Sequence, residues 1–438
     1  MNPVKVGLLG IGTVGGGTVS VLKRNAKEIE RRAGRGIVVT HAAARDLQRV
    51  RNCDMAGIQL TDDPFAVVNN PDVDVVVELI GGTLTARELV SKAIANGKHV
   101  VTANKALIAK YGNELFAQAQ EQGVMVAFEA AVAGGIPVIK AIREGLAGNR
   151  IEWLAGIING TGNFILTEMR DKGRDFADVL AEAQRLGYAE ADPTFDVEGI
   201  DAAHKLTILA SIAFGIPLQF DRVYTEGISK ITAEDVNYAE ELGYRIKHLG
   251  IARRTEQGVE LRVHPTLIPY RRLIANVDGV MNAVLVKGDA VGPTLYYGAG
   301  AGAEPTASAV VADLVDVVRA LTADPENRVP HLAFQPDALV DIPILPMSEV
   351  ETAYYLRMAA EDRPGVLADI TRILADAGIS IEAIIQKEQA PEARHVPVIM
   401  LTHRMRERQM NEAIQRIEAL GSINGAVTRI RVECLNKN

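Results

Sequence analysis

The chain has 438 residues, enough for roughly two to four domains that each bury their own core. Hydrophobic residues make up 48% of it and charged residues 23%, a composition that excludes a disordered, collagen-like or coiled-coil protein. The 47 basic and 55 acidic residues give a formal charge of −8, and no long basic run relieves it. We therefore expect no nucleic-acid partner.

Cysteine use and hydropathy indicate the compartment. Cys53 and Cys434 are the two cysteines, and they suit a reducing compartment better than a disulfide framework. The N-terminal residues run into a strand pattern without the features of a signal peptide, and no apolar run reaches the ~18 residues of a membrane span. We expect a soluble, cytoplasmic protein with no membrane association.

The first 133 residues alternate short β-branched runs with helical stretches. The run 73–80 is almost continuously apolar, which is typical of a strand covered on both faces. The pattern predicts a doubly wound α/β domain. We expect its strands at 4–9, 37–43, 73–80, 99–102 and 124–128, with a helix at about 14–31.

Residues 134–304 mix amphipathic helices with strand candidates at 150–158 and 280–286, and predict an α+β domain. A helix follows at about 305–322, which we expect to complete the first domain. Prolines then punctuate residues 323–350, which we interpret as a linker. Residues 351–438 carry a compact βαββαβ pattern, which predicts a ferredoxin-like domain.

Gly10, Gly12 and Gly15 form a G-x-G-x-x-G pattern between the first strand and the first helix. Glycines there let the backbone turn tightly and approach a pyrophosphate at the helix N-terminus, and Thr13 and Val14 lie in the same loop. In this βαβ setting the motif indicates a Rossmann-like, dinucleotide-binding domain, although glycines alone also form ordinary turns.

Arg45 and Lys105 follow two further strands, at the edge where such sheets bind ligands. NAD sites usually have an acidic residue at the end of the second strand, where this chain has Arg45. A guanidinium at that position suits the 2′-phosphate of NADP. Arg45 therefore favours NADP and leaves NAD open; the alternative is a surface arginine beside Asp46. The alternative for Lys105 is an ordinary lysine at a helix start.

Asp201 and Lys205 lie one turn apart on one face of an apolar helix, after a loop that carries Glu190, Asp192 and Asp196. One interpretation is a surface ion pair worth a few tenths of a kcal/mol. The other is a buried pair, in which the lysine donates a proton to an oxygen and the loop carboxylates hold a substrate ammonium.

The stretch 183–205 resembles the signature of homoserine dehydrogenases. The positions that fit are Ala183, Gly187, Asp192, Pro193, Asp196, Gly199, Asp201 and Lys205. The glycine-rich N-terminus, the TANK segment at 102–105 and the segment 298–311 are also similar to that family, and DRPGVL at 362–367 resembles an ACT domain. One departure is Gly162, where the family usually has Thr or Ser.

The resemblance implies hydride exchange between NAD(P)H and L-aspartate 4-semialdehyde, which gives L-homoserine for threonine, methionine and isoleucine biosynthesis. Lys205 is then the proton donor in reduction and the acceptor in oxidation. Asp201 orients substrate or a bound water, and Glu190 binds the amino acid with Asp196 nearby.

The resemblance also implies ligand contacts that the sequence pattern itself does not reveal. Lys105 would reach both cofactor and substrate, and Gly302 would close on the nicotinamide side. A monovalent cation, usually sodium in this family, would bind Glu129 and three backbone carbonyls. These carbonyls belong to Val132, Gly134 and Ile136.

The ACT domain implies regulation. The loop 362–365 and the facing strand would bind a small amino acid at a dimer interface, and the resemblance points to feedback inhibition by L-threonine. We expect a homodimer or a homotetramer. The alternative is that this domain mediates association alone.

Two other functions stay open. A non-catalytic sensor of NADPH and amino acids would have no need of the Asp201–Lys205 pair. Another semialdehyde-handling enzyme, such as an aspartate-semialdehyde dehydrogenase, requires a nucleophilic cysteine. Neither Cys53 nor Cys434 lies in a segment typical of such a site.

Overall fold

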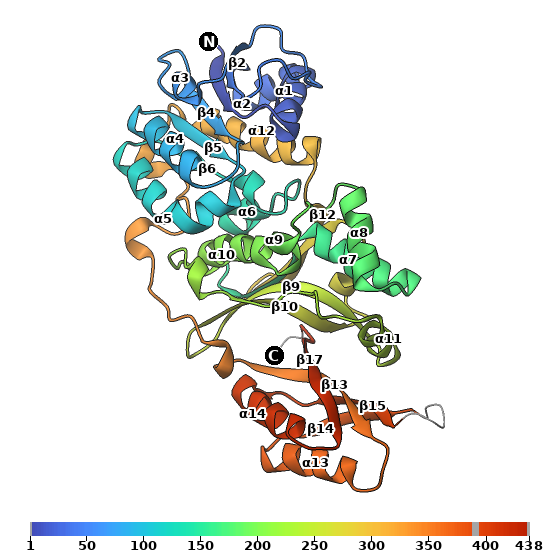
Figure 1. Ribbon diagram of the computed structural model, residues 1–438. Coiled ribbons are helices and arrows are strands. Elements are labelled where there is room, and N and C mark those ends of the chain that lie inside the picture. The colour runs from blue at the N-terminus through green and yellow to red at the C-terminus, as the bar shows by residue number, and fades with distance from the viewer. Residues whose placement is uncertain (1, 388–393, 436–438) are drawn as a thin grey trace. The chain divides into compact units, whose positions relative to one another are not determined.

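The computed structural model describes residues 2–387 and 394–435, and its ribbon is drawn in Figure 1. The chain forms two compact units, each assembled from separate stretches of sequence. Unit 1 contains residues 1–160, 201–223 and 280–342, and unit 2 contains residues 161–200, 224–279 and 343–438. Residues 134–304, which we expected to form one α+β domain, are shared between the two units.

A six-stranded parallel sheet forms the N-terminal part of unit 1, in the order β3-β2-β1-β4-β5-β6. The predicted Rossmann-like sheet is therefore confirmed. Strand order reverses between β1 and β4, and ligands of such sheets bind beyond the strand ends at that point. The strands are β1 (Val4–Leu9), β2 (Ile37–Ala43), β3 (Gln59–Thr61), β4 (Val75–Glu78), β5 (His99–Thr102) and β6 (Val126–Ala127).

The helices that pack with this sheet include one from late in the chain. Val310 and Leu314 of that helix share a core with Val19 of the first helix and Val6 of β1. The single helix predicted at 14–31 is wrong, because the chain breaks at Asn25 and forms two helices. The helices are α1 (Thr13–Arg24), α2 (Ala26–Ala33), α3 (Pro64–Val68), α4 (Leu84–Ala95), α5 (Lys105–Glu121) and α12 (Ala303–Ala320).

The rest of unit 1 combines antiparallel strands with a helix that is almost completely buried. The strands β7 (Ile151–Ile157), β11 (Met281–Gly288) and β12 (Gly292–Ala299) pair in the order β12-β11-β7. Helix α10 (Ile200–Phe214) is buried at every residue from Asp201 onward. A helix that is buried on all sides belongs to a protein interior, and this one carries Asp201, His204 and Lys205 into it.

Unit 2 is built on a long hairpin, β9 (Tyr244–Arg254) with β10 (Val259–Pro269). The short strand β8 (Tyr224–Thr225) pairs with β10 in parallel, and so does β17 (Ile423–Val432). The helices of this part are α7 (Gly160–Lys172), which starts at the unit boundary, α8 (Phe176–Arg185), α9 (Thr194–Val197) and α11 (Ala233–Glu241).

The C-terminal part of unit 2 has the predicted ferredoxin-like fold, with strands in the order β17-β13-β15-β14. Alternation along β13 (Glu351–Glu361) decides its packing. Leu356 joins the core under the two helices of this part, and Tyr355 joins the core with α7 and α11. Its other elements are α13 (Val366–Asp376), β14 (Ile381–Gln386), β15 (His395–Thr402), β16 (Met405–Arg406) and α14 (Glu407–Glu418). Within residues 2–387 and 394–435, no helix is both long and apolar enough to cross a bilayer.

Candidate active site

A lysine and an aspartate meet on α10. Asp201 lies in the first turn and Lys205 one turn later, so both side chains project from the same face. The Lys205 Nζ is 2.6 Å from Asp201 Oδ2 and donates a second hydrogen bond, of 2.7 Å, to the backbone carbonyl of Ile158. The two side chains are 10% and 5% exposed, so the interpretation as a surface ion pair is wrong.

Two more residues converge on the Asp201 carboxylate. The Lys105 Nζ lies 3.0 Å from Oδ1, and the Asn159 amide nitrogen donates to Oδ2 at 2.9 Å. Lys105 is the first residue of α5, directly beyond β5, and its side chain is 34% exposed. The structure thus joins Asp201 and Lys205 with Lys105, which belongs to a different sequence motif.

Neighbouring ammonium groups keep this carboxylate ionised. Burial alone would raise the pKa of Asp201, but Lys205 and Lys105 outweigh burial and hold the pKa well below its usual value. The carboxylate in turn fixes the position of both ammonium groups. A fixed ammonium at the carboxyl edge of this parallel sheet can donate a proton to an oxygen that gains negative charge.

Sequence reasoning missed two polar residues of this region, Asn159 and Glu78. Glu78 ends β4 and is fully buried, and burial raises its pKa. Its carboxylate accepts hydrogen bonds from the Thr102 hydroxyl at 2.7 Å and from the backbone N–H of Ile80 at 2.9 Å. It therefore ties the loop after β4 to the end of β5. The available signal was a single acidic residue at the end of an apolar strand.

The glycine pattern has the geometry that a dinucleotide requires. Gly10 has a φ of +96°, and a β-carbon there would lie 2.9 Å from the Leu79 carbonyl oxygen. At Gly15 a β-carbon would lie 2.4 Å from the Gly10 carbonyl oxygen, whereas at Gly12 it would meet nothing within 4 Å. The loop is closely packed on one side and open at Gly12, before the N-terminus of α1 at Thr13. These residues fit the pyrophosphate of a dinucleotide.

The other expected site residues have the following positions. Arg45 is exposed just beyond β2, and Gly302 precedes α12 with a φ of +131°. Glu190 is exposed after α8, and Asp196 is half-buried in α9. These last two lie in unit 2, so their roles beside Lys205 stay predictions.

Three family models match successive parts of the chain. Residues 10–129 match "Homoserine dehydrogenase, NAD binding domain", residues 137–315 match "Homoserine dehydrogenase", and residues 354–422 match "ACT domain". The chain is 72% identical to the homoserine dehydrogenase of Pseudomonas aeruginosa, over 100% of both. The chain belongs to the homoserine dehydrogenase family. It is an NAD(P)-dependent oxidoreductase of amino-acid biosynthesis that acts on a CH–OH group.

Other homoserine dehydrogenases are similar over most or all of the chain. That of Neisseria gonorrhoeae is 59% identical over 100% of both chains. The crystal structure of the Thiobacillus denitrificans enzyme superimposes with a TM-score of 0.95 at 72% identity, covering 100% of this chain and 99% of that one. A hyperthermophilic archaeal homoserine dehydrogenase, solved in complex with NADPH, has a TM-score of 0.60 at 25% identity and covers 72% of this chain and 97% of its own.

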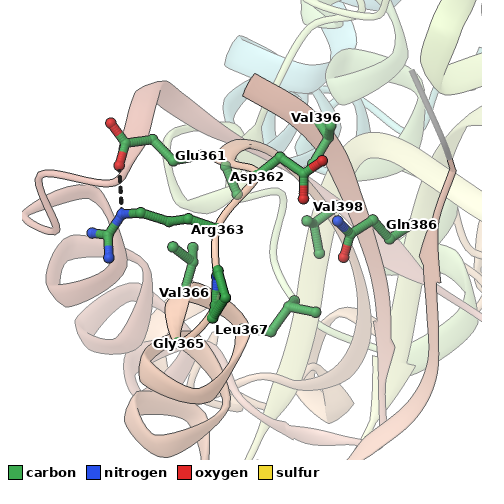
Figure 2. Close-up of a pocket in the computed structure, with 11 residues that line it drawn as sticks. Glu361, Asp362, Arg363, Gly365, Val366, Leu367, Gln386, Val396 and Val398 are labelled. Atoms are coloured by element: carbon green, nitrogen blue, oxygen red, sulfur yellow. Dashed lines mark hydrogen bonds and ion pairs between the residues drawn. The ribbon is translucent and has the colours of Figure 1, made fainter. Parts of the chain in front are cut away.

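The ACT domain of this homoserine dehydrogenase contains a cavity of about 340 Å³ beside the loop 362–365. Figure 2 shows the side chains of Asp362 and Gln386 near each other on facing sides of the cavity. Arg363 turns toward Glu361 and donates a 2.8 Å hydrogen bond to it. A cavity of this size accommodates a small molecule.

Glu129 is buried directly after β6. Its two carboxylate oxygens accept backbone N–H groups of Ile139 and Lys140, each at 2.9 Å. Burial and the adjacent Asp313 raise the pKa of Glu129 to about 7. In the part of the chain that the structure describes, no cluster of three His, Cys, Asp or Glu residues could hold a metal. The cation site that the family resemblance implies at Glu129, with the backbone carbonyls of Val132, Gly134 and Ile136, stays a prediction.

Proposed function

We propose that this enzyme interconverts L-aspartate 4-semialdehyde and L-homoserine with NADP as its preferred cofactor and NAD as a second possibility. The buried Lys205–Asp201 pair carries the proposal. The nicotinamide group supplies or accepts the hydride when the cofactor is bound. The protein side chains must then orient the aldehyde, stabilise the developing alkoxide and deliver one proton.

Lys205 is the proton donor in reduction and the proton acceptor in oxidation. Asp201 holds the Lys205 ammonium in place and orients the substrate or a water. Lys105 contacts cofactor and substrate from the end of β5. Glu190 and Asp196 bind the substrate ammonium, for which carboxylates are the appropriate partners.

The cofactor lies on the Gly10–Gly15 loop. The open space beside Gly12 supports a close approach of the pyrophosphate, and Gly302 closes the nicotinamide side. Arg45 is exposed beyond β2, where its guanidinium can meet a 2′-phosphate. The NADPH complex of the archaeal relative is consistent with this preference.

L-threonine is the proposed feedback inhibitor, bound in the ACT cavity by the loop 362–365. Asp362 offers a carboxylate for the threonine ammonium, and Gln386 offers an amide. Inhibition requires that the bound state favour a less active arrangement of the enzyme. We propose a homodimer or homotetramer in which this cavity lies at a subunit interface.

Sodium is the proposed cation at Glu129, with a structural role. The support is the buried carboxylate of Glu129, whose pKa is raised by burial and by its neighbour Asp313. A bound cation would favour the ionised carboxylate and so offset both effects. We place the enzyme in the cytoplasm, which agrees with its two free cysteines.

An enzyme that forms a thioester with this semialdehyde is disfavoured. Such chemistry needs a thiolate, and burial raises the pKa of the Cys53 thiol despite the opposing effects of Arg51 and Lys23. The sensor alternative is disfavoured by the buried Asp201–Lys205 pair, which a binding protein has no reason to maintain.

The deciding experiment follows absorbance at the reduced-nicotinamide band with L-homoserine and NADP or NAD, each with and without L-threonine. Homoserine-dependent reduction of NADP, faster than that of NAD, is the expected result, and threonine should suppress it. A folded sample that binds NADPH but shows no turnover in either direction would instead support the sensor.

A further inference from the structure

Unit 2 contains a second cavity, of about 730 Å³, where the ACT domain meets the segment around β8. We call it the junction cavity. One wall comes from residues 224–227 and 229–231 with Glu198 and Pro265, and the other comes from α14 and β17. No lining residue is common to this cavity and the one at the loop 362–365. Its volume is within the range of small-molecule sites.

Two side chains of opposite charge are available in the junction cavity. Glu198 is half-buried and accepts a hydrogen bond of 2.7 Å from the hydroxyl of Ser229. Lys230 is exposed, and across residues 2–387 and 394–435 it forms no ion pair. The wall therefore offers one carboxylate and one ammonium to a ligand.

The other charged groups of the wall neutralise each other. Glu226 lies 2.8 Å from the buried Arg431, and Arg429 lies 3.1 Å from Glu407 of α14. Burial opposes ionisation of Glu226, but Arg431 outweighs it and lowers the pKa of that carboxyl. These groups therefore have charged partners already, and Glu198 and Lys230 are left for a ligand that carries both charges.

The rest of the wall includes an aliphatic surface. Ile231 and Val427 are buried, and Ile414 is half-buried on α14. Contact with these side chains would remove the aliphatic part of a ligand from water. Opposite charges next to an aliphatic surface match a zwitterionic α-amino acid with an aliphatic side chain.

The wall of the junction cavity also packs against residues 197–199, the segment that leads into α10. A β-carbon at Gly227 would lie 2.2 Å from Glu198 Oε2, and the Ile228 N–H donates 2.9 Å to the Val197 carbonyl. Thr225 of the wall touches Gly199, where a β-carbon would lie 3.1 Å from its methyl group. Gly199 precedes Asp201 by two residues. A displacement of this wall would therefore shift the backbone at the start of α10, the helix that carries Asp201 and Lys205.

We propose that the junction cavity is an effector site, separate from the ACT loop, for a free α-amino acid with an aliphatic side chain. Its ammonium binds Glu198, its carboxylate binds Lys230, and its side chain packs on Ile414 and Val427. The regulatory consequence rests on the proposed function; the binding does not.

The test is calorimetric titration of the full-length enzyme with L-isoleucine and L-methionine. Deaminated and decarboxylated isoleucine, 3-methylpentanoate and 2-methylbutylamine, are the control ligands. At least one of the two amino acids should bind, and neither control ligand should match it. Lys230→Gln and Glu198→Gln should each weaken binding about tenfold or more. Lys92→Gln, at an exposed lysine of α4, and Asp362→Asn, in the ACT loop, should leave it unchanged.

Several results would overturn the proposal. They are no binding at millimolar concentration, binding lost in Asp362→Asn but kept in Lys230→Gln, and equal binding of the control ligands. A change of oligomeric state in Lys230→Gln, seen by sedimentation velocity, would instead make the cavity a subunit interface. Homoserine oxidation is assayed on the same samples. Turnover without binding refutes the effector site alone, and binding without turnover refutes the proposed reaction alone.

Discussion

The Lys205 ammonium lies 2.6 Å from the Asp201 carboxylate, and both side chains project from a helix whose residues are buried from Asp201 to Phe214. A buried ion pair adds little net stability, because desolvation of both charges offsets their attraction. Its presence in this apolar helix is better explained by chemistry than by folding. The pair is therefore the first target for mutation.

Lys205→Met removes the ammonium and keeps an unbranched side chain of similar length. We expect kcat to fall at least about 100-fold, the usual contribution of a positioned proton donor. Binding of NADPH, measured by fluorescence titration, should change little because the Gly10–Gly15 loop makes the proposed cofactor contacts. Lys92→Met at an exposed lysine is the control. If Lys205→Met lost NADPH binding and its fold together, the lysine would be structural.

Asp201→Asn keeps the shape of the side chain and removes its charge. Lys105 and Lys205 would then lie beside each other without the carboxylate that both contact at present. We expect kcat to fall about 10- to 100-fold and the pH–rate profile to shift, because the uncompensated ammonium groups repel. Asp221→Asn, at an exposed aspartate, should behave as wild type. An unchanged profile in Asp201→Asn would remove Asp201 from the mechanism.

Arg45→Ala tests the basis of cofactor choice. Loss of the guanidinium should raise KM for NADP about tenfold and leave KM for NAD nearly unchanged, since NAD has no 2′-phosphate. Steady-state assays with both cofactors measure the ratio. Arg49→Ala, at another exposed arginine of the same segment, is the matched control. Equal effects on the two cofactors would contradict phosphate recognition by Arg45.

Gly12 and Gly15 should respond differently to the same added methyl group. Gly15→Ala places a β-carbon 2.4 Å from a backbone oxygen and should lower the Tm, because the backbone must shift. Gly12→Ala meets nothing within 4 Å, so the protein should fold normally and lose NADPH affinity where the methyl group enters the cofactor space. Thermal scans with and without NADPH separate the two effects. Normal NADPH binding by Gly12→Ala would place the cofactor elsewhere.

Glu433 stabilises the end of β17 at neutral pH. Its carboxylate accepts hydrogen bonds from Arg262 at 2.6 Å and Arg253 at 3.0 Å. Burial alone would raise its pKa, but these arginines outweigh burial and lower the pKa to about 2. A pKa depressed on folding stabilises the protein above the ordinary value of 4.5, and that contribution is lost as the pH falls from 4.5 toward 2.

Glu433→Gln should therefore destabilise the protein by about 1 to 3 kcal/mol at pH 7, since the buried Arg262 loses one of its two carboxylate partners and keeps Glu260. The difference in Tm from wild type should shrink as the pH falls through this window. Glu412→Gln, at an exposed glutamate of α14, should show neither effect. A difference in Tm between Glu433→Gln and wild type that stayed constant with pH would mean that the charge of the Glu433 carboxylate contributes nothing to stability.

Local pattern was sufficient for many elements of this protein. The predicted strands 4–9, 37–43 and 99–102 coincide with β1, β2 and β5, because short runs rich in β-branched residues encode strands directly. β3 was not predicted, since three residues that include Gln59 and Thr61 carry no usable period. The helix break at Asn25 was likewise hidden inside one helical pattern.

The sequence by itself determined the family and the Rossmann-like and ACT folds, because these depend on local periodicity and on residues at fixed spacing. It also named Lys205 as the candidate proton donor, a role that stays a prediction. Tertiary structure alone decided that Lys105 and Asn159 reach Asp201 and that Glu78 ties the loop after β4 to the end of β5. It also decided that residues 134–304 contribute to two units. The physical reason is that an ion pair or buried hydrogen bond between distant segments depends on how helices and sheets pack, and packing leaves no periodic trace in the chain.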